Sequence, residues 1–162
     1  MKALKGVVLA QAAMLVAALA VLAATSGAHF FSASGDVNDG GALVATWDEA
    51  GVGNETVAYT LDANASATYA CINGGGNHPK AANKETKSDQ VTTGGTFEPR
   101  NGRVTGSLTT GPLSAGDFSC PSGQQLVLAC VSYSGITLTD NTNGVSASID
   151  DASRTFVPID GC

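Results

Sequence analysis

The sequence predicts an all-β fold, an immunoglobulin-like β-sandwich of about eight antiparallel strands stapled by two disulfides. Three observations predict it. After residue 28 the chain shows no helical periodicity, and short runs of alternating apolar residues recur instead. Turn residues separate these runs at intervals of about 8–12 residues, which is typical of a sandwich. All four cysteines lie in the same part of the chain.

The first 28 residues have the organisation of an export signal. Two lysines lie within the first five residues, an apolar stretch runs from Val7 to Ala24, and small residues follow up to Ala28. This order is typical of a secretory signal peptide. We therefore expect a signal peptide over residues 1–28 and a single secreted domain over residues 29–162. Cleavage four or five residues earlier and an uncleaved membrane anchor are the alternatives.

The charge balance limits the kind of partner. The chain carries 8 Lys and Arg against 14 Asp and Glu, a formal net charge of −6. Removal of the signal segment takes two lysines away and leaves a more acidic domain. Because a negative surface repels phosphate backbones, we expect no general binding to nucleic acid. We expect contact with a membrane only through the signal segment, if it stays uncleaved.

The cysteines predict two disulfide bonds. An even number of cysteines in an exported domain reads as disulfides, and four of them can pair in three ways. We favour Cys71–Cys120 with Cys130–Cys162, because this pairing ties distant segments together and constrains the unfolded chain more. A bridge from Cys120 to Cys130 would close only a local hairpin. No Cys-x-x-Cys pair is present, which disfavours a zinc site.

The strands follow in order along the chain. They are expected over residues 42–47, 55–72, 91–97, 103–109, 124–133, 136–139, 145–149 and 154–157. The second run is expected to break at residues 62–64. Asn101-Gly102 and Asn143-Gly144 are hairpin-turn dipeptides. The run 124–133 is apolar on both faces, as in a central strand, and Trp47, the only tryptophan, is expected between the sheets.

A long irregular segment over residues 73–89 interrupts the strand pattern. Long loops on small domains are often functional, and Cys71 fixes the base of this one. Its lysines form the only basic cluster of the acidic domain. A plain solvated loop is the favoured interpretation, because Glu85 and Asp89 lie among the lysines, and contact with an unidentified extracellular or cell-wall ligand, such as an anionic polymer, is the alternative. The residues of this candidate binding loop are Asn73, His78, Lys80, Lys84 and Lys87.

Several runs of the chain resemble a known group of proteins. They are Ala28–Phe30, Glu49–Asn54, Tyr69–Gly76, Pro79–Lys84, Gly116–Pro121 and Leu138–Val145. Together they resemble a group of small secreted actinobacterial proteins, over nearly the whole exported part. The group has no established activity, so the resemblance implies export and a β-rich domain. It also fits a Cys71–Cys120 bridge.

Copper is the one specific cofactor hypothesis. His29 and His78 are the only histidines, and cleavage after Ala28 would make His29 the amino terminus. An amino-terminal histidine chelates copper through its α-amine and Nδ1, and the imidazole of His78 would complete a three-nitrogen site. Such a histidine brace is the site of copper-dependent polysaccharide monooxygenases. A copper-binding protein of this kind is the alternative function.

No other group of residues forms a catalytic motif. Hydrolysis by a carboxylate pair needs two acids that face each other across a cleft. Asp48, Glu49, Glu98 and Asp117 are candidates by residue type alone. The sequence therefore favours a secreted, non-enzymatic binding or structural protein of the extracellular space or cell surface, with no cofactor.

Overall fold

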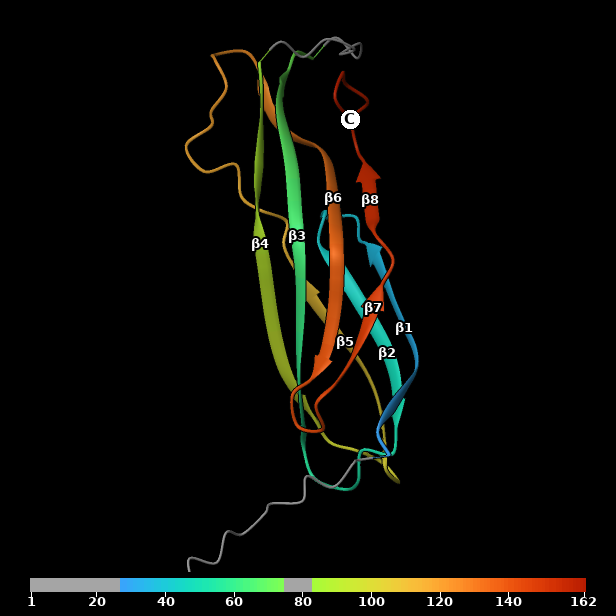
Figure 1. Ribbon diagram of the computed structural model, residues 1–162. Helices are drawn as coiled ribbons and strands as arrows, with labels where there is room; N and C mark the ends of the chain where they lie inside the picture. Colours follow the sequence, from blue (N-terminus) through green and yellow to red (C-terminus); the bar gives the residue numbers. More distant parts are fainter. Residues whose placement is uncertain (1–26, 75–82) are drawn as a thin grey trace, which may run out of the picture.

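The structure is a computed structural model that describes residues 27–74 and 83–162. The described chain forms two antiparallel sheets packed as a sandwich (Figure 1). Its strands are β1 (His29–Val37), β2 (Leu43–Ala50), β3 (Val57–Ile72), β4 (Lys84–Phe97), β5 (Arg103–Thr110), β6 (Gln125–Asp140), β7 (Val145–Ile149) and β8 (Ala152–Thr155). Within the described ranges, no helix has the length and apolar character needed to cross a membrane.

The two sheets differ in length. The three-stranded sheet has the order β1-β2-β5, and the five-stranded sheet has the order β4-β3-β6-β7, with β8 also paired to β6. Strands β3 and β6 each have 16 residues, whereas β2 and β5 have 8. At about 3.3 Å per residue, the long strands reach roughly twice as far. In Figure 1 they continue past the three-stranded sheet toward the end where the C-terminus lies.

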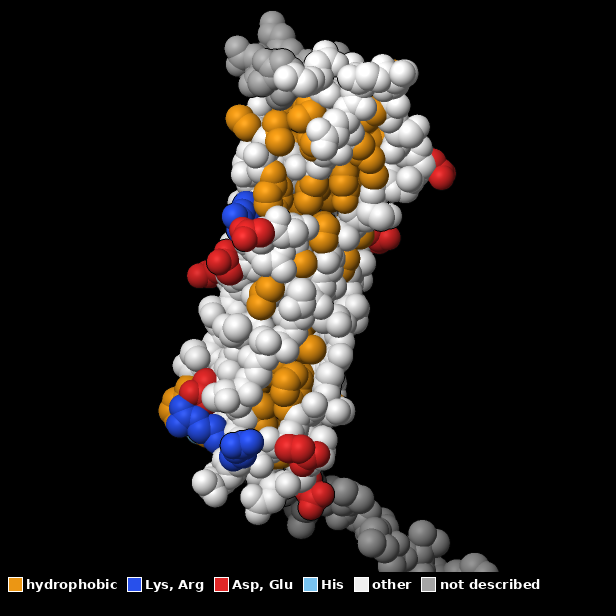
Figure 2. Space-filling view, turned by 180° about the vertical axis from the view of Figure 1, so that it is seen from behind, with side chains coloured by type: hydrophobic (Ala, Val, Ile, Leu, Met, Phe, Trp, Pro, Cys, Tyr) orange, Lys and Arg blue, Asp and Glu red, His pale blue; other side chains and the backbone are white. Residues whose placement is uncertain are grey.

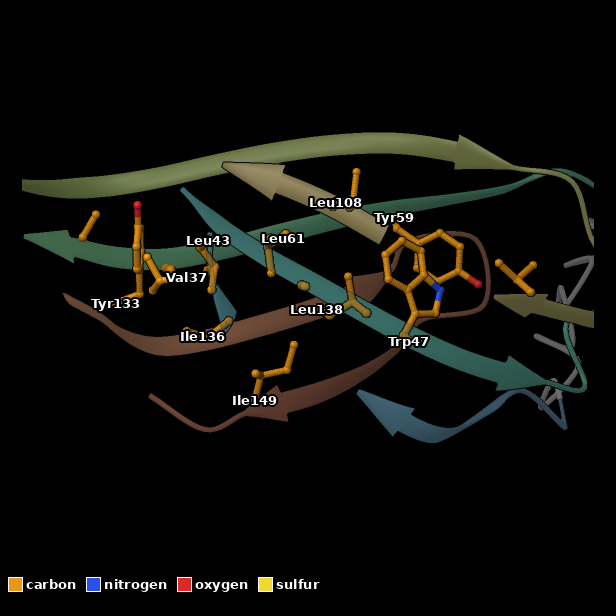
Figure 3. Close-up of a cluster of buried hydrophobic side chains, with 14 of the residues drawn as sticks. Val37, Leu43, Trp47, Tyr59, Leu61, Leu108, Tyr133, Ile136, Leu138 and Ile149 are labelled. Carbon is orange, nitrogen blue, oxygen red and sulfur yellow. The ribbon is translucent and has the colours of Figure 1, made fainter. Parts of the chain in front are cut away.

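The core lies between the sheets where both are present. Along β3, alternate residues from Val57 to Ala67 are buried, as expected for a strand with one face on a core. Trp47 is 4% exposed and lies beside Tyr59 (Figure 3), with 4.7 Å between the ring centroids. Its ring centroid also lies 4.9 Å from that of Phe97. The prediction that Trp47 is a core residue is confirmed. Gly106 lies against this ring, because a Cβ atom there would be 2.7 Å from Trp47 Cζ2.

Both disulfides have the predicted pairing. Cys71 at the end of β3 is bonded to Cys120, with 5.5 Å between the Cα atoms. Cys130 of β6 is bonded to Cys162, with 5.9 Å between the Cα atoms. The first bridge and a hydrogen bond of 2.7 Å from the Tyr69 hydroxyl to the carbonyl of Leu113 fasten the β5–β6 connection to the long sheet. Two disulfides are consistent with an extracellular protein.

Two expected strand breaks fall at a single bulge between the continuous strands β3 and β6. β3 runs without interruption through residues 62–64, but its pairing with β6 shifts register between Asp62 and Asn64. On β6 the two expected strands are one, and Gly135 joins them with a φ of 59°. A glycine in this region of φ accommodates an extra residue without ending the strand. The turn residues at 62–64 and at Gly135 therefore indicate a shift in strand register and not a reversal of the chain.

The expected irregular segment is shorter than predicted, and one strand was missed. β4 begins at Lys84, so Lys84 and Lys87 lie on a strand and not in a loop. The long β3 supplies their backbone partners up to Ala70, and this pairing overrides the low strand propensity of Lys and Glu. The sequence also gave no expectation of a strand over residues 29–37. Between the inward Phe30 and Val37, the inward positions are the small Ala33 and Gly35, so the apolar alternation of this strand is weak.

Candidate functional site

His29 lies at the start of β1 and is exposed. Its Nδ1 is 2.8 Å from the carbonyl oxygen of Gly27, and its ring lies edge-on to Phe31 at 4.7 Å. The preceding residue, Ala28, is 7% exposed and belongs to the core cluster. His78 lies outside the described residues, so the copper site stays a prediction.

The lysines of the candidate loop that the structure describes have partners in the same chain. Lys84 donates a hydrogen bond from Nζ to the carbonyl oxygen of Asp160. Lys87 forms an ion pair with Glu85. Asn73 is exposed just after β3, and Lys80 lies outside the described residues. Lys84 and Lys87 therefore hold local structure and do not form a free basic cluster.

The four candidate carboxylates do not share a cleft. Asp48 is ion-paired with Arg103 on the outer face of the three-stranded sheet. Glu98 accepts a hydrogen bond of 2.7 Å from the Thr56 hydroxyl. Asp117 is exposed in the β5–β6 connection, and Glu49 is wholly buried. Within the described ranges, no three histidine, cysteine or acidic side chains are grouped so that they could hold a metal ion.

Glu49 instead forms part of a buried polar cluster. Neither Glu49 nor Asp140 has any exposed surface, and the Tyr59 hydroxyl donates a hydrogen bond of 2.7 Å to Glu49 Oε2. Burial raises the pKa of Glu49 to about 7, the Tyr59 hydrogen bond opposes this shift, and the neighbouring Asp140 carboxylate adds to it. Burial also raises the pKa of Tyr59. Because neither carboxyl group reaches the surface, Glu49 and Asp140 are not available to contact a ligand.

An exposed aromatic ring lies at the end of the sandwich where β1 starts. The pairing of β1 with β2 shifts register between Phe30 and Ser32, so Phe31 is the extra residue of a β-bulge. Phe30 packs against the core, with its ring centroid 6.4 Å from that of Tyr59. Phe31 is 61% exposed. A bulge re-aims a side chain in this way and is common next to functional sites.

Arg103 contacts this ring, and Asp48 holds Arg103 in turn. The guanidinium carbon of Arg103 lies 5.1 Å from the centre of the Phe31 ring, within the range of a cation–π contact. Arg103 Nε donates a hydrogen bond of 2.6 Å to Asp48 Oδ1, and Nη2 bonds the other oxygen. This hydrogen bonding to Arg103 lowers the pKa of Asp48, so Asp48 stays ionised. We call Phe31, Arg103 and Asp48 the Phe31 platform.

A tight hairpin brings a second arginine to the platform. Asn101 and Gly102 have φ values of 53° and 70°, the two positive values that a type I′ turn requires, which confirms the predicted hairpin. Arg100 and Arg103 exchange backbone hydrogen bonds of 2.8 and 3.1 Å, so they lie directly opposite each other. A shallow hollow of about 170 Å³ opens beside them, lined by Glu98, Arg100, Arg103 and Thr105. We call it the hairpin hollow.

Figure 2 shows the molecule from behind the view of Figure 1. Basic, acidic and hydrophobic side chains gather at its lower end, where β1 and β5 begin in Figure 1. The sequence reasoning missed Phe31, Arg100 and Arg103 as site residues. Two signals were present. His29-Phe30-Phe31 breaks apolar alternation as a bulge does, and a two-residue Asn-Gly turn places its flanking residues opposite each other.

No protein-family model matches this chain, and neither a curated protein nor a solved structure is found to match it. The function of the platform and the hollow therefore has to be argued from their own geometry and chemistry.

Proposed function

We propose that this chain is an exported, non-enzymatic glycan-binding protein of the extracellular space or cell surface, with the Phe31 platform as its binding surface. The exposure of Phe31, 61% on a strand held by flanking contacts, is the observation that carries the proposal. An aromatic ring offers a flat apolar face for the C–H face of a sugar ring, while neighbouring polar groups bond its hydroxyls. Because Arg103 and His29 already fix the ring, binding would cost little side-chain entropy.

Export and the immunoglobulin-like character of the fold belong to the same proposal. The signal-like segment and the pairing of all four cysteines support export. The strand order supports an immunoglobulin-like sandwich. The sheet β1-β2-β5 corresponds to strands A, B and E, and β4-β3-β6-β7 corresponds to C′, C, F and G.

The platform is tested by removing its ring. We expect the disulfide-intact protein to bind soluble oligosaccharides on a glycan array, and Phe31→Ala to weaken the best of them by roughly tenfold or more, because the stacking face is lost. Isothermal titration calorimetry measures the affinity. Leu126→Ala is the matched control, since Leu126 is the other exposed large apolar residue of the described chain, at 39%, and lies on β6.

The control variant shows whether the loss of glycan binding is specific to Phe31 or follows from the loss of any exposed apolar side chain. Leu126→Ala is expected to bind as the wild type does, with both variants unfolding near the wild-type temperature. Equal binding by Phe31→Ala and the wild type, or no binding to any glycan on the array, would contradict the proposal.

A further inference from the structure

We infer that the glycan bound by the Phe31 platform is acidic, and that Arg100 in the hairpin hollow binds its carboxylate. This inference rests on the proposed function and adds the class of ligand to it. It is carried by the pairing of two arginines across one hairpin, beside an exposed aromatic ring.

The two arginines are an unfavourable pair in the free protein. Arg100 and Arg103 exchange both backbone hydrogen bonds, so their side chains leave the hairpin on the same face. Like charges placed directly opposite each other are destabilising. Asp48 neutralises Arg103, but Arg100 has no side-chain hydrogen bond or ion pair with any residue in the described ranges. A bound anion would give Arg100 the charged partner that Asp48 already gives Arg103.

The unpaired Arg100 is unusual in a protein with so few basic residues. The chain has only 8 basic residues against 14 acidic ones, and other described basic residues are engaged. Arg154 pairs with Asp39, and Lys87 pairs with Glu85. A guanidinium offers two parallel N–H groups to a carboxylate, which a lysine does not. Arg100 is therefore the group on this side of the protein best suited to recognise a carboxylate.

Glu98 favours a sugar acid over a ligand with several negative charges close together. Its carboxylate lines the same hollow and is bonded to the Thr56 hydroxyl. It would repel a compact polyanion, but it can accept a hydrogen bond from a sugar hydroxyl. A hollow with one free guanidinium, one carboxylate and the Thr105 hydroxyl beside an aromatic face fits a uronate residue, which carries one carboxylate, several hydroxyls and an apolar ring face.

The test uses two probes, an oligogalacturonate and its methyl ester, in which each carboxylate loses its charge and gains a methyl group. We expect the wild type to bind the acid form roughly tenfold more tightly in calorimetry, because a charge-assisted bidentate bond is lost in the ester. Arg100→Gln is expected to remove this preference, so that the variant binds the acid form no more tightly than the ester. Arg154→Gln is the control, since it removes the same charge from β8, away from the hairpin.

The outcomes separate this inference from the proposed function. If the wild type binds both forms equally and Phe31→Ala weakens this binding, the inference of an acidic ligand is overturned. The proposal that the Phe31 platform binds glycans is then still supported. An equal loss of preference in Arg100→Gln and Arg154→Gln would also overturn it, because the preference would then reflect net charge alone. If the wild type binds neither form, the inference of an acidic ligand is overturned. The glycan array then tests whether the Phe31 platform binds any glycan.

Discussion

Raising the pH from 4.5 to 8 is expected to lower the free energy of unfolding by about 3 kcal/mol through one residue, Glu49. The pKa of Glu49 rises from its ordinary 4.5 to about 7 in the fold, chiefly by burial. Between these values the folded protein holds a proton that the unfolded chain has released. Stability therefore falls as the pH rises through this window and levels off above it. Urea denaturation at a series of pH values measures the change.

Glu49→Gln isolates this effect. Glutamine keeps an oxygen that accepts the Tyr59 hydrogen bond, and its amide stays neutral beside the buried Asp140 carboxylate. We expect the free energy of unfolding of the variant to lack the fall that Glu49 causes between pH 5 and 8. The variant is expected to be more stable than the wild type at pH 8. Parallel profiles for the wild type and Glu49→Gln would show that Glu49 does not titrate in this range.

Removal of the Cys71–Cys120 bridge is expected to cost about 4 kcal/mol of stability. The bridge closes a loop between residues 49 positions apart, and opening it gives the unfolded chain more conformations. It also fastens the β5–β6 connection to the end of β3. The double variant Cys71→Ala/Cys120→Ala tests this in denaturant unfolding at constant pH.

The second bridge is the natural comparison. Cys130 and Cys162 are 32 positions apart, so Cys130→Ala/Cys162→Ala is expected to lose slightly less, by a few tenths of a kcal/mol. Addition of reductant to the wild type should destabilise it more than either double variant. An unfolding midpoint that does not move with reductant would show that the bridges do not stabilise the fold.

Local features of the sequence predicted much of this fold. Asn101-Gly102 requires two positive φ values, and the turn has them. The alternation of apolar residues along β3 predicted which face is buried. The disulfide pairing followed from an argument about distant segments, and both bridges confirm it. These features depend on neighbours in the chain or on simple chain constraints, so the sequence carries them directly.

The buried charges and the candidate site could not be predicted in the same way. Glu49 meets Tyr59 and Asp140 only when the two sheets pack, and no spacing in the sequence announces that contact. Phe31 is exposed because a bulge shifts the register of β1 against β2. The sequence directed attention to His29 and the loop lysines instead. Of these, His29 lies beside the platform through its ring contact with Phe31.

The most direct test of the platform is an amide NMR titration of the ¹⁵N-labelled, disulfide-intact protein with oligogalacturonate. The account predicts that shift changes cluster on the bulge of β1 and on the hairpin, at Phe31, Arg100, Arg103 and Thr105 and their neighbours. Shift changes confined to the far end of the five-stranded sheet, around Leu126, or no changes at all, would contradict it.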